Sequence, residues 1–280
     1  MTSIEWRPVG SIDPRELGKG RHQAHNAVQW LARMARSYVE PADDDSHTAL
    51  DWAADDGALV TKEIAPDIVL EFRLPELTMQ FKEGGKRVSH KFDMDDRSPA
   101  EAEAWLLVEL LHRGVDREKL SKDLPYSLPG MMVGDAVHYD RLETEELLRE
   151  LTQWYANGAS AIEAVCKQSG AVEGGRPTVT CRPRYFDLVA SIPLPNGGGQ
   201  ASAIKVGLAP GDGHYGEPYF YVVAQPELDA ADLPELPEVG HWHTKDFVGA
   251  ILPASRIVEY KLDGDDVVAF LSAAIAAVRD

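Results

Sequence analysis

The feature that most constrains the fold is an alternation of apolar and polar residues along residues 67–74. The apolar side chains stand at every second position, namely Ile68, Leu70, Phe72 and Leu74. Because successive side chains of a strand point to opposite faces, this pattern predicts a strand with one buried face. Two further apolar runs, at residues 77–81 and 88–92, flank Gly84 and Gly85. Runs of this kind joined by a glycine turn predict an antiparallel hairpin.

Helical patterns precede and follow this β-rich block. In residues 21–39 apolar side chains recur every three or four positions, which places them on one face of a helix. Residues 98–101 have the sequence of a capping box with a proline at the first helical position, and the helix is expected to end at Gly114. A third helix is expected over residues 140–168, and a fourth one after Asp263.

The second half of the chain repeats this order of elements. Its candidate strands are residues 178–182, 185–193, 201–208, 219–225 and 242–252. Residues 67–75 and 187–195 share an Asp, a Val, a Leu and a Pro at matching places. The pair Gln-Trp also occurs at residues 29–30 and again at residues 153–154. These matches favour an internal duplication.

We therefore expect an α+β fold made of two α–β(antiparallel)–α halves, which form a pseudo-symmetric internal duplication packed as one body. The first half spans residues 1–115 and the second half spans residues 140–280. Residues 116–139, which contain two prolines and two glycines, are expected to connect them.

Charge and composition exclude several classes of protein. The 280 residues include 28 Lys and Arg against 46 Asp and Glu, a net charge of −18. This surface repels phosphate groups, so we expect neither nucleic acid nor a membrane as a partner. The apolar run at residues 267–278 is shorter than the roughly 20 residues of a membrane span. Without a secretory signal, Cys166 and Cys181 fit reduced, buried thiols of a cytoplasmic protein.

Residues 211–216 spell the motif G-x-G-x-x-G, which in dinucleotide-binding proteins lies between a strand and a helix. There the N-terminus of the helix holds the pyrophosphate. Here residues 219–223 have the pattern of a strand, so the motif stands between two strands. We therefore expect a glycine-rich hairpin loop and no dinucleotide site.

The sharpest chemical feature is the sequence His241-Trp242-His243. Residues two apart on a strand point the same way, so both imidazoles could bind one divalent metal ion while Trp242 faces the other side. Candidates for a third ligand are His214, Asp212, Glu217, His25 and His90. The alternative is that the two histidines line a strand or a loop near the surface.

Other residues are candidates for binding a small molecule. Asp187 lies in a β-rich run, where a carboxylate must be solvated or partnered, so it is either a pocket carboxylate or the partner of a hydrogen bond or salt bridge. The aromatic residues at positions 215–221 either line a cavity or pack in the core. His25 either pairs with His22 on a metal or sits at the edge of the core. The candidate ligand-binding residues are His25, Asp187, His214, Tyr219, His241 and His243.

Several short segments, in their order and spacing, resemble a known family. They are residues 25–30, 57–61, 139–140, 186–188, 210–211, 217–221, 226–227 and 252–253. The chain resembles a bacterial family of similar length that is catalogued only as a domain of unknown function. The resemblance implies a fold and a compartment, and no established activity.

The resemblance also implies that this chain is a divergent member. Members of the family carry a His and a Trp before the Phe-Asp pair, where this sequence has Thr180 and Pro183. They carry a His-Glu dyad before the Pro-Gly loop, where this sequence has Ala201 and Ser202. A polar site built from those groups would be partly lost here.

The preferred hypothesis for function is a ligand-binding or non-catalytic protein, with a small-molecule pocket where the sheets meet the helices. One alternative is a metal-dependent, hydrolase-like enzyme with His241 and His243 as metal ligands and a nearby carboxylate as base. Another is an interaction scaffold or homodimer that uses an exposed aromatic face. The sequence leaves the ligand, any catalytic residue and the oligomeric state open.

Overall fold

The structure is a computed structural model, and it describes residues 4–171, 178–194, 202–231 and 233–279. The predicted strand start at Ala201 lies outside these residues. The chain divides into two compact units, which are described separately. Unit 1 comprises Met1–Gly18, Gln153–Thr180 and Asp187–Asp280, and unit 2 comprises Lys19–Thr152 and Cys181–Phe186. The division at residues 116–139 stays a prediction.

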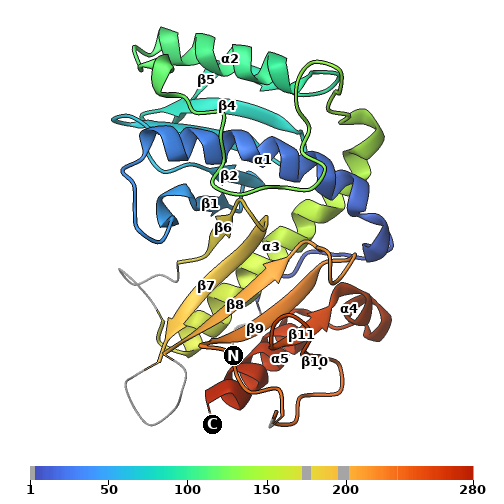
Figure 1. Cartoon of the computed structure of the whole chain (residues 1–280). Coiled ribbons are helices and arrows are strands. Elements are labelled where there is room, and N and C mark those ends of the chain that lie inside the picture. The colour runs from blue at the N-terminus through green and yellow to red at the C-terminus, as the bar shows by residue number, and fades with distance from the viewer. Residues whose placement is uncertain (1–3, 172–177, 195–201, 232, 280) are drawn as a thin grey trace. The chain divides into compact units, whose positions relative to one another are not determined.

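Unit 2 contains strands with two long helices beside them (Figure 1). The helices are α1 (Gly18–Tyr38) and α2 (Pro99–His112). In spatial order the strands are β6 (Thr180–Arg182), β1 (Leu50–Ala53), β2 (Ala58–Val60), β3 (Ile68–Arg73), β4 (Thr78–Glu83) and β5 (Lys86–Asp93). The pairs from β1 to β5 are antiparallel. Short 3-10 helices lie at Ser46–Thr48, Arg117–Lys119 and Leu142–Thr144.

Local sequence explains the best-predicted part of unit 2. Gly84 and Gly85 both have positive φ values, 53° and 77°, and they turn β4 into β5. The Ser98 side chain accepts a hydrogen bond from the Glu101 backbone nitrogen, and the Glu101 carboxylate accepts one from the Ser98 backbone nitrogen, which completes the predicted capping box. Trp105 of α2 packs against Phe81 of β4, with ring centroids 5.6 Å apart. The predicted hairpin and its following helix are confirmed.

Polar residues along α1 hold the segment that follows α2. The Oε1 atom of Gln23 accepts a hydrogen bond from the Asp140 backbone nitrogen, and Oδ1 of Asn26 accepts one from the Met132 backbone nitrogen. Further along the helix, the Gln29 side chain accepts a hydrogen bond from the Tyr126 hydroxyl. Arg33 donates a hydrogen bond to the Lys122 carbonyl, and the Ser37 hydroxyl accepts one from the Ser121 backbone nitrogen. Residues 116–140 are therefore fastened to one stripe of α1 through α1 side chains.

Unit 1 also combines an antiparallel sheet with helices (Figure 1). In spatial order its strands are β10 (His241–His243), β11 (Gly249–Pro253), β9 (Tyr219–Gln225), β8 (Ala203–Ala209) and β7 (Asp187–Pro193). The helices are α4 (Ala254–Tyr260), α5 (Gly264–Arg279) and the part of α3 (Glu145–Gln168) from Gln153 onward. A 3-10 helix lies at Pro14–Glu16.

One face of the unit 1 sheet packs against α3. In β8 the side chains of Ile204, Val206 and Leu208 alternate with the rest of the strand and are buried. Gly158 of α3 lies so close to Leu208 that a Cβ atom at residue 158 would stand 2.5 Å from its Cδ2 atom. The glycine at residue 158 therefore lets α3 pack closely on this face.

The structure differs from the sequence-based prediction at several elements. Residues 242–252, predicted as one strand, form the antiparallel pair β10 and β11. Helix α3 begins at Glu145, after a 3-10 turn, because the Asp140 carboxylate caps the Glu143 nitrogen of that turn. Strand β1 and helix α4 were not predicted, since short segments carry too few residues for a clear period.

The predicted α+β class with antiparallel strands is confirmed. No helix in the described part of the chain combines the length and the apolar composition that crossing a membrane requires. Cys166 and Cys181 are both buried and form no disulfide bond, as predicted.

Candidate functional site

The face of the unit 1 sheet opposite to α3 carries a cluster of aromatic and histidine side chains. Strand pairing aligns one row across this face, from β7 to β10, as Val189, Gly207, Tyr221, Ile251 and His241. Neighbouring residues extend its apolar floor, and the floor consists of Val189, Ala209, Tyr219, Tyr221 and Ile251, with Tyr215, Val223 and Phe247 packed against it. We call this surface, together with His214, His241, His243 and the carboxylates of Asp187 and Asp212 that bind its tyrosines, the aromatic face.

Strand β10 places His241 and His243 on the aromatic face, as their spacing predicted. The hydroxyl oxygen of Tyr215 lies 2.9 Å from Nε2 of His241 and 2.9 Å from Nδ1 of His243. On its other side, Nε2 of His243 contacts the backbone carbonyl of Lys245. Trp242 has a separate bond, from its Nε1 to the Pro234 carbonyl at 2.7 Å. One phenol therefore joins both imidazoles.

Ring contacts hold the histidines in place. The His243 ring stacks on Phe247, with centroids 4.2 Å apart and planes at 23°. His214 meets both of them edge-on, at 5.1 Å from His243 and 5.4 Å from Phe247. Offset and edge-to-face contacts at these distances are favourable. His214, which is far from β10 in sequence, thus belongs to the same cluster.

Two tyrosine–carboxylate hydrogen bonds anchor the floor. The Tyr219 hydroxyl donates to Oδ2 of Asp212 at 2.6 Å, and the Tyr221 hydroxyl donates to Oδ2 of Asp187 at 2.6 Å. Asp187 is only 2% exposed, so this bond offsets part of the cost of burying its charge. The carboxylate predicted as either a pocket group or a hydrogen-bond partner is therefore a hydrogen-bond partner on the aromatic face.

Because residue 207 is a glycine, the Tyr221 hydroxyl has room to reach the Asp187 carboxylate. A Cβ atom at residue 207 would lie 2.4 Å from both Cζ and the hydroxyl oxygen of Tyr221. The Tyr221 ring therefore lies directly over β8, and its hydroxyl reaches Asp187 on β7 beyond. Glycine at this strand position marks a close approach of a neighbouring group.

The loop at residues 211–216 positions Tyr215. It connects the antiparallel strands β8 and β9, so the predicted glycine-rich hairpin loop is confirmed. The Asp212 carboxylate accepts hydrogen bonds from the backbone nitrogens of His214 and Tyr215, at 2.8 and 3.0 Å. The carboxylate that holds Tyr219 therefore also fixes the backbone that carries Tyr215.

Burial controls the charge state of these groups. It raises the pKa of Tyr219, an effect that the Asp212 carboxylate strengthens. Burial and Asp212 also raise the pKa of Tyr215. Partial burial of its ring lowers the pKa of His241, although the residue as a whole is exposed, and His243 and Arg256 lower this pKa further. At neutral pH both phenols therefore keep their protons and His241 is uncharged.

Five of the six predicted binding residues belong to the aromatic face, and they are Asp187, His214, Tyr219, His241 and His243. His25 belongs to unit 2. There its Nε2 atom lies 3.0 Å from the Pro183 carbonyl oxygen, and its ring stacks on Phe186 at 5.3 Å. Burial lowers the pKa of His25. These contacts are those of a histidine at the edge of a core.

The proposed third metal ligands have other partners in the structure. Asp212 binds Tyr219, and the Glu217 carboxylate accepts hydrogen bonds from the backbone nitrogen and hydroxyl of Ser255 at the start of α4. His90 lies in unit 2, 3.7 Å from the Glu109 carboxylate. Among the residues that the structure describes, no three His, Cys, Asp or Glu side chains are grouped so as to hold a metal ion.

Sequence reasoning grouped the aromatic residues at positions 215–221, but it missed which of them share the aromatic face, and it missed the role of Gly207. The matching parity of positions 219 and 221 on one strand was available as a signal that both tyrosines share a face. No signal in the sequence indicated that Tyr215 lies beside β10. The order of the strands in the sheet brings the 211–216 loop next to β10, and residue spacing along the chain does not reveal that order.

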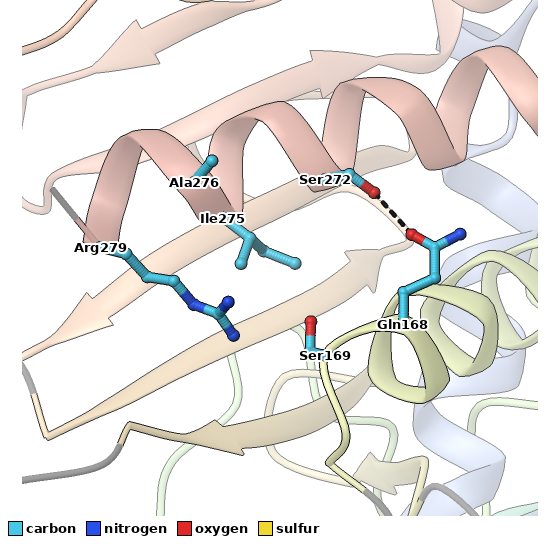
Figure 2. Close-up of a pocket in the computed structure, with 6 residues that line it drawn as sticks. All are labelled: Gln168, Ser169, Ser272, Ile275, Ala276 and Arg279. Carbon is cyan, nitrogen blue, oxygen red and sulfur yellow. Dashed lines mark hydrogen bonds between the residues drawn. The ribbon is translucent and has the colours of Figure 1, made fainter.

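Two surface hollows lie elsewhere. In unit 1, a hollow of about 270 Å³ lies between the end of α3 and the end of α5. Figure 2 shows the hydrogen bond from Ser272 to Gln168 at one side of it and the Arg279 side chain at the other. In unit 2, a hollow of about 280 Å³ lies beside His90, Glu109 and Arg113. The residues lining these two hollows are not those of the aromatic face.

No protein-family model matches the sequence, and neither a curated protein nor a solved structure matches it. The resemblance to a bacterial family of unknown function therefore stays a prediction. Inference about function rests on the aromatic face itself, which is an ordered cluster of polar and aromatic groups on an antiparallel sheet.

Proposed function

We propose that the protein binds a small, uncharged molecule with a flat ring on the aromatic face of unit 1. The observation that carries this proposal is the Tyr215 hydroxyl held between His241 and His243 above a floor of tyrosines. Ligand sites typically combine apolar and aromatic walls with a few polar groups in fixed positions. The aromatic face has both components.

The exposure of these groups supports binding over a purely structural role. Tyr219 and Tyr221 are buried, but His241 is exposed, and Tyr215 and His243 are half-buried. The polar groups nearest to solvent are thus held rigidly by hydrogen bonds and ring stacking. A binding site benefits from such preorganisation, because little conformational entropy is lost when the ligand arrives.

Charge favours an uncharged ligand. The net charge of the chain is −18, and the aromatic face contains the carboxylates of Asp187 and Asp212. An anion would be repelled. Both carboxylates already accept a short hydrogen bond from a tyrosine, which reduces their value to a cation. Stacking on tyrosine and histidine rings suits an uncharged ring.

A titration with phenol, observed by NMR on protein with labelled aromatic side chains, tests this proposal. We expect the resonances of Tyr215, Tyr219 and His241 to shift together. Tyr215→Ala should weaken phenol binding at least about tenfold, because it removes a central contact. Tyr185→Ala, at an exposed tyrosine of unit 2, is the matched control. Equal binding by the Tyr215→Ala protein, or shifts confined to other residues, would contradict the proposal.

The metal-dependent alternative rests on the two imidazoles of β10, which share one face. A metal ion bound to both imidazoles would have to break one contact of His243, either with the Tyr215 hydroxyl or with the Lys245 carbonyl. Elemental analysis of purified protein decides between the two. Stoichiometric zinc, iron or manganese that is lost in a His241→Ala/His243→Ala double variant would favour a metal-dependent enzyme over the ring-binding site.

We also propose a cytoplasmic location, which the two buried, unbridged thiols support. Burial raises the pKa of the Cys166 thiol to about 11, so this thiol is poorly reactive at neutral pH. Fractionation of cells that express a tagged full-length chain tests the location.

The internal duplication is likewise a proposal. Its support is that Asp67 immediately precedes β3 and Asp187 begins β7, and that Trp30 of α1 and Trp154 of α3 are both buried. An experimental structure tests it. The helix–strands–helix segments that begin with α1 and with α3 should then superimpose with these four residues at equivalent positions.

A further inference from the structure

The hydrogen bonds around Tyr215 determine where each imidazole proton lies. A backbone carbonyl only accepts hydrogen bonds, so Nε2 of His243 must carry the proton in its contact with the Lys245 carbonyl. In a neutral ring the other nitrogen then has a lone pair. Nδ1 of His243 therefore accepts the hydrogen bond from the Tyr215 hydroxyl, 2.9 Å away.

The direction of the hydrogen bond between Tyr215 and His241 follows from the bond between Tyr215 and His243. The Tyr215 hydroxyl has one proton, and that proton points to His243. Its oxygen must then accept a hydrogen bond from His241, so Nε2 of His241 is protonated. In neutral His241 the lone pair is consequently on Nδ1. In the described residues, Nδ1 of His241 has no hydrogen-bond partner, and the residue is exposed.

We infer that Nδ1 of His241 is the ligand-contacting acceptor of the aromatic face, and that its ligands are uncharged ring compounds bearing an O–H or N–H donor. This inference rests on the proposed ligand site and names its ligand class. The Tyr215 hydroxyl and the His243 ring position the acceptor nitrogen, because they set the tautomer of His241. The aromatic ring of Tyr215 remains a contact of the ligand.

The surroundings of His241 support an uncharged ring. The charged or titratable groups that act on it are His243 on its own strand, Tyr215 from the 211–216 loop and Arg256 from α4. Partial burial of its ring lowers the pKa of His241, and His243 and Arg256 lower it further. At neutral pH the Nδ1 lone pair is therefore available to accept a proton donor.

If His243 carried a second proton, both hydrogen bonds of the Tyr215 hydroxyl would reverse their direction. Both ring nitrogens of that residue would then donate, the Tyr215 oxygen would accept from His243, and the hydroxyl would donate to Nε2 of His241. Nδ1 of His241 would carry the proton and present a donor. The two arrangements place the proton on different nitrogens of His241.

Nitrogen-15 NMR of the ligand-free, full-length protein at neutral pH tests the inference directly. We expect a pyridine-like shift for Nδ1 of His241 and a pyrrole-like shift for its Nε2. In Tyr215→Phe, which keeps the ring and removes the hydroxyl, these shifts should move toward the average of two exchanging tautomers. A pyrrole-like shift at Nδ1 in the unmodified protein would overturn the inference.

Binding of phenol and of anisole gives the functional test. The two probes share a ring, and anisole lacks the O–H donor. We expect anisole to bind about fivefold more weakly, the usual effect of one hydrogen bond. In His241→Phe, which keeps an aromatic ring at the surface, the difference should disappear.

The outcomes separate this inference from the proposed function. If neither probe binds at the aromatic face, the proposed ligand site fails, and the tautomer measurement still judges the assignment of His241. If both probes bind there equally well in the unmodified protein, the ligand site stands and the inference is wrong. The Tyr185→Ala protein should behave like the unmodified protein in both measurements.

Discussion

Unit 1 and unit 2 treat their polar side chains differently. In unit 2 the polar stripe of α1 is directed at its own chain, since Gln23, Asn26 and Gln29 each accept a hydrogen bond from residues 116–140. In unit 1 the series from Lys245 through His243 and Tyr215 ends on an exposed histidine. Polar side chains that bond to their own chain, as on α1, maintain a fold. A series of hydrogen bonds that ends on an exposed side chain, as at His241, leaves that side chain available to a ligand.

The histidines show the same contrast. His25 in unit 2 forms a hydrogen bond with the Pro183 carbonyl, and its ring stacks on Phe186. His241 in unit 1 has one nitrogen bound by Tyr215 and the other without a partner among the described residues. Residue type alone therefore does not separate a structural histidine from a binding one. Exposure does so, because His241 is exposed and His25 is half-buried.

The largest loss of stability is expected from a substitution at Gln29 in unit 2. This fully buried side chain accepts from the Tyr126 hydroxyl and donates to the Pro183 and His25 carbonyls. Gln29→Ala should lower the free energy of unfolding by about 3 kcal/mol, because it leaves buried polar groups without a partner and opens a cavity. Urea denaturation measures this loss.

The matched control is Gln168→Ala, at an exposed residue near the end of α3. It should change the free energy of unfolding by no more than about 0.5 kcal/mol. A similar loss in both variants would show that the α1 stripe does not have the structural role that distinguishes unit 2.

The next largest effect is expected at Gly207 in unit 1. In Gly207→Ala the new methyl group would overlap the Tyr221 ring, 2.4 Å away, and the ring would have to leave its bond to Asp187. Overpacking of this kind costs about 2 kcal/mol. Thermal denaturation measures the cost, and the Tyr221 ring resonances should shift in NMR spectra.

Gly213→Ala is the control for this change, because a Cβ atom there would meet nothing within 4 Å. Its stability should match that of the unmodified protein. If Gly207→Ala were equally neutral, Tyr221 would have another way to reach Asp187, and the close packing of the aromatic face would be refuted.

A smaller effect is expected from Tyr221→Phe, which deletes only the hydroxyl. The buried Asp187 carboxylate then loses a hydrogen bond of 2.6 Å. Bonds to charged groups contribute about 1.5 kcal/mol or somewhat more, so the free energy of unfolding should fall by about that amount. Tyr185→Phe, at an exposed tyrosine, should cause no measurable loss in the same denaturation experiment.

The smallest effect is a pH dependence that both units share. The pKa values of His25 and His241 are lowered, mainly by burial, so both residues bind fewer protons in the folded than in the unfolded protein. Their contribution to stability is therefore complete above the unfolded pKa of about 6.5 and is lost as the pH falls below it.

Denaturation at pH 7 and pH 5 measures this effect. Replacing His25 by Gln should reduce the loss of stability in acid more than replacing His241 by Gln, because His25 is the more buried of the two. The reverse order would show that the Tyr215-linked histidine is the one shielded from water. That result would weaken the contrast between the two units.

Some of this protein was determined by local sequence. The 67–92 hairpin and the capping box at Ser98 were predicted because alternation, paired glycines and a cap act within a few residues. The shared face of His241 and His243 was predicted for the same reason, since strand geometry alone determines it. So was the hairpin loop at residues 211–216, from the strand that follows it.

Other features were decided only by the tertiary structure. Tyr215 meets β10, and Tyr221 crosses β8 to reach Asp187, because the strands are arranged in the order β10-β11-β9-β8-β7. That order depends on which long-range pairings bury the most apolar surface, and no spacing along the chain encodes it. Local sequence thus set the direction of each side chain, and the strand order chose its partner.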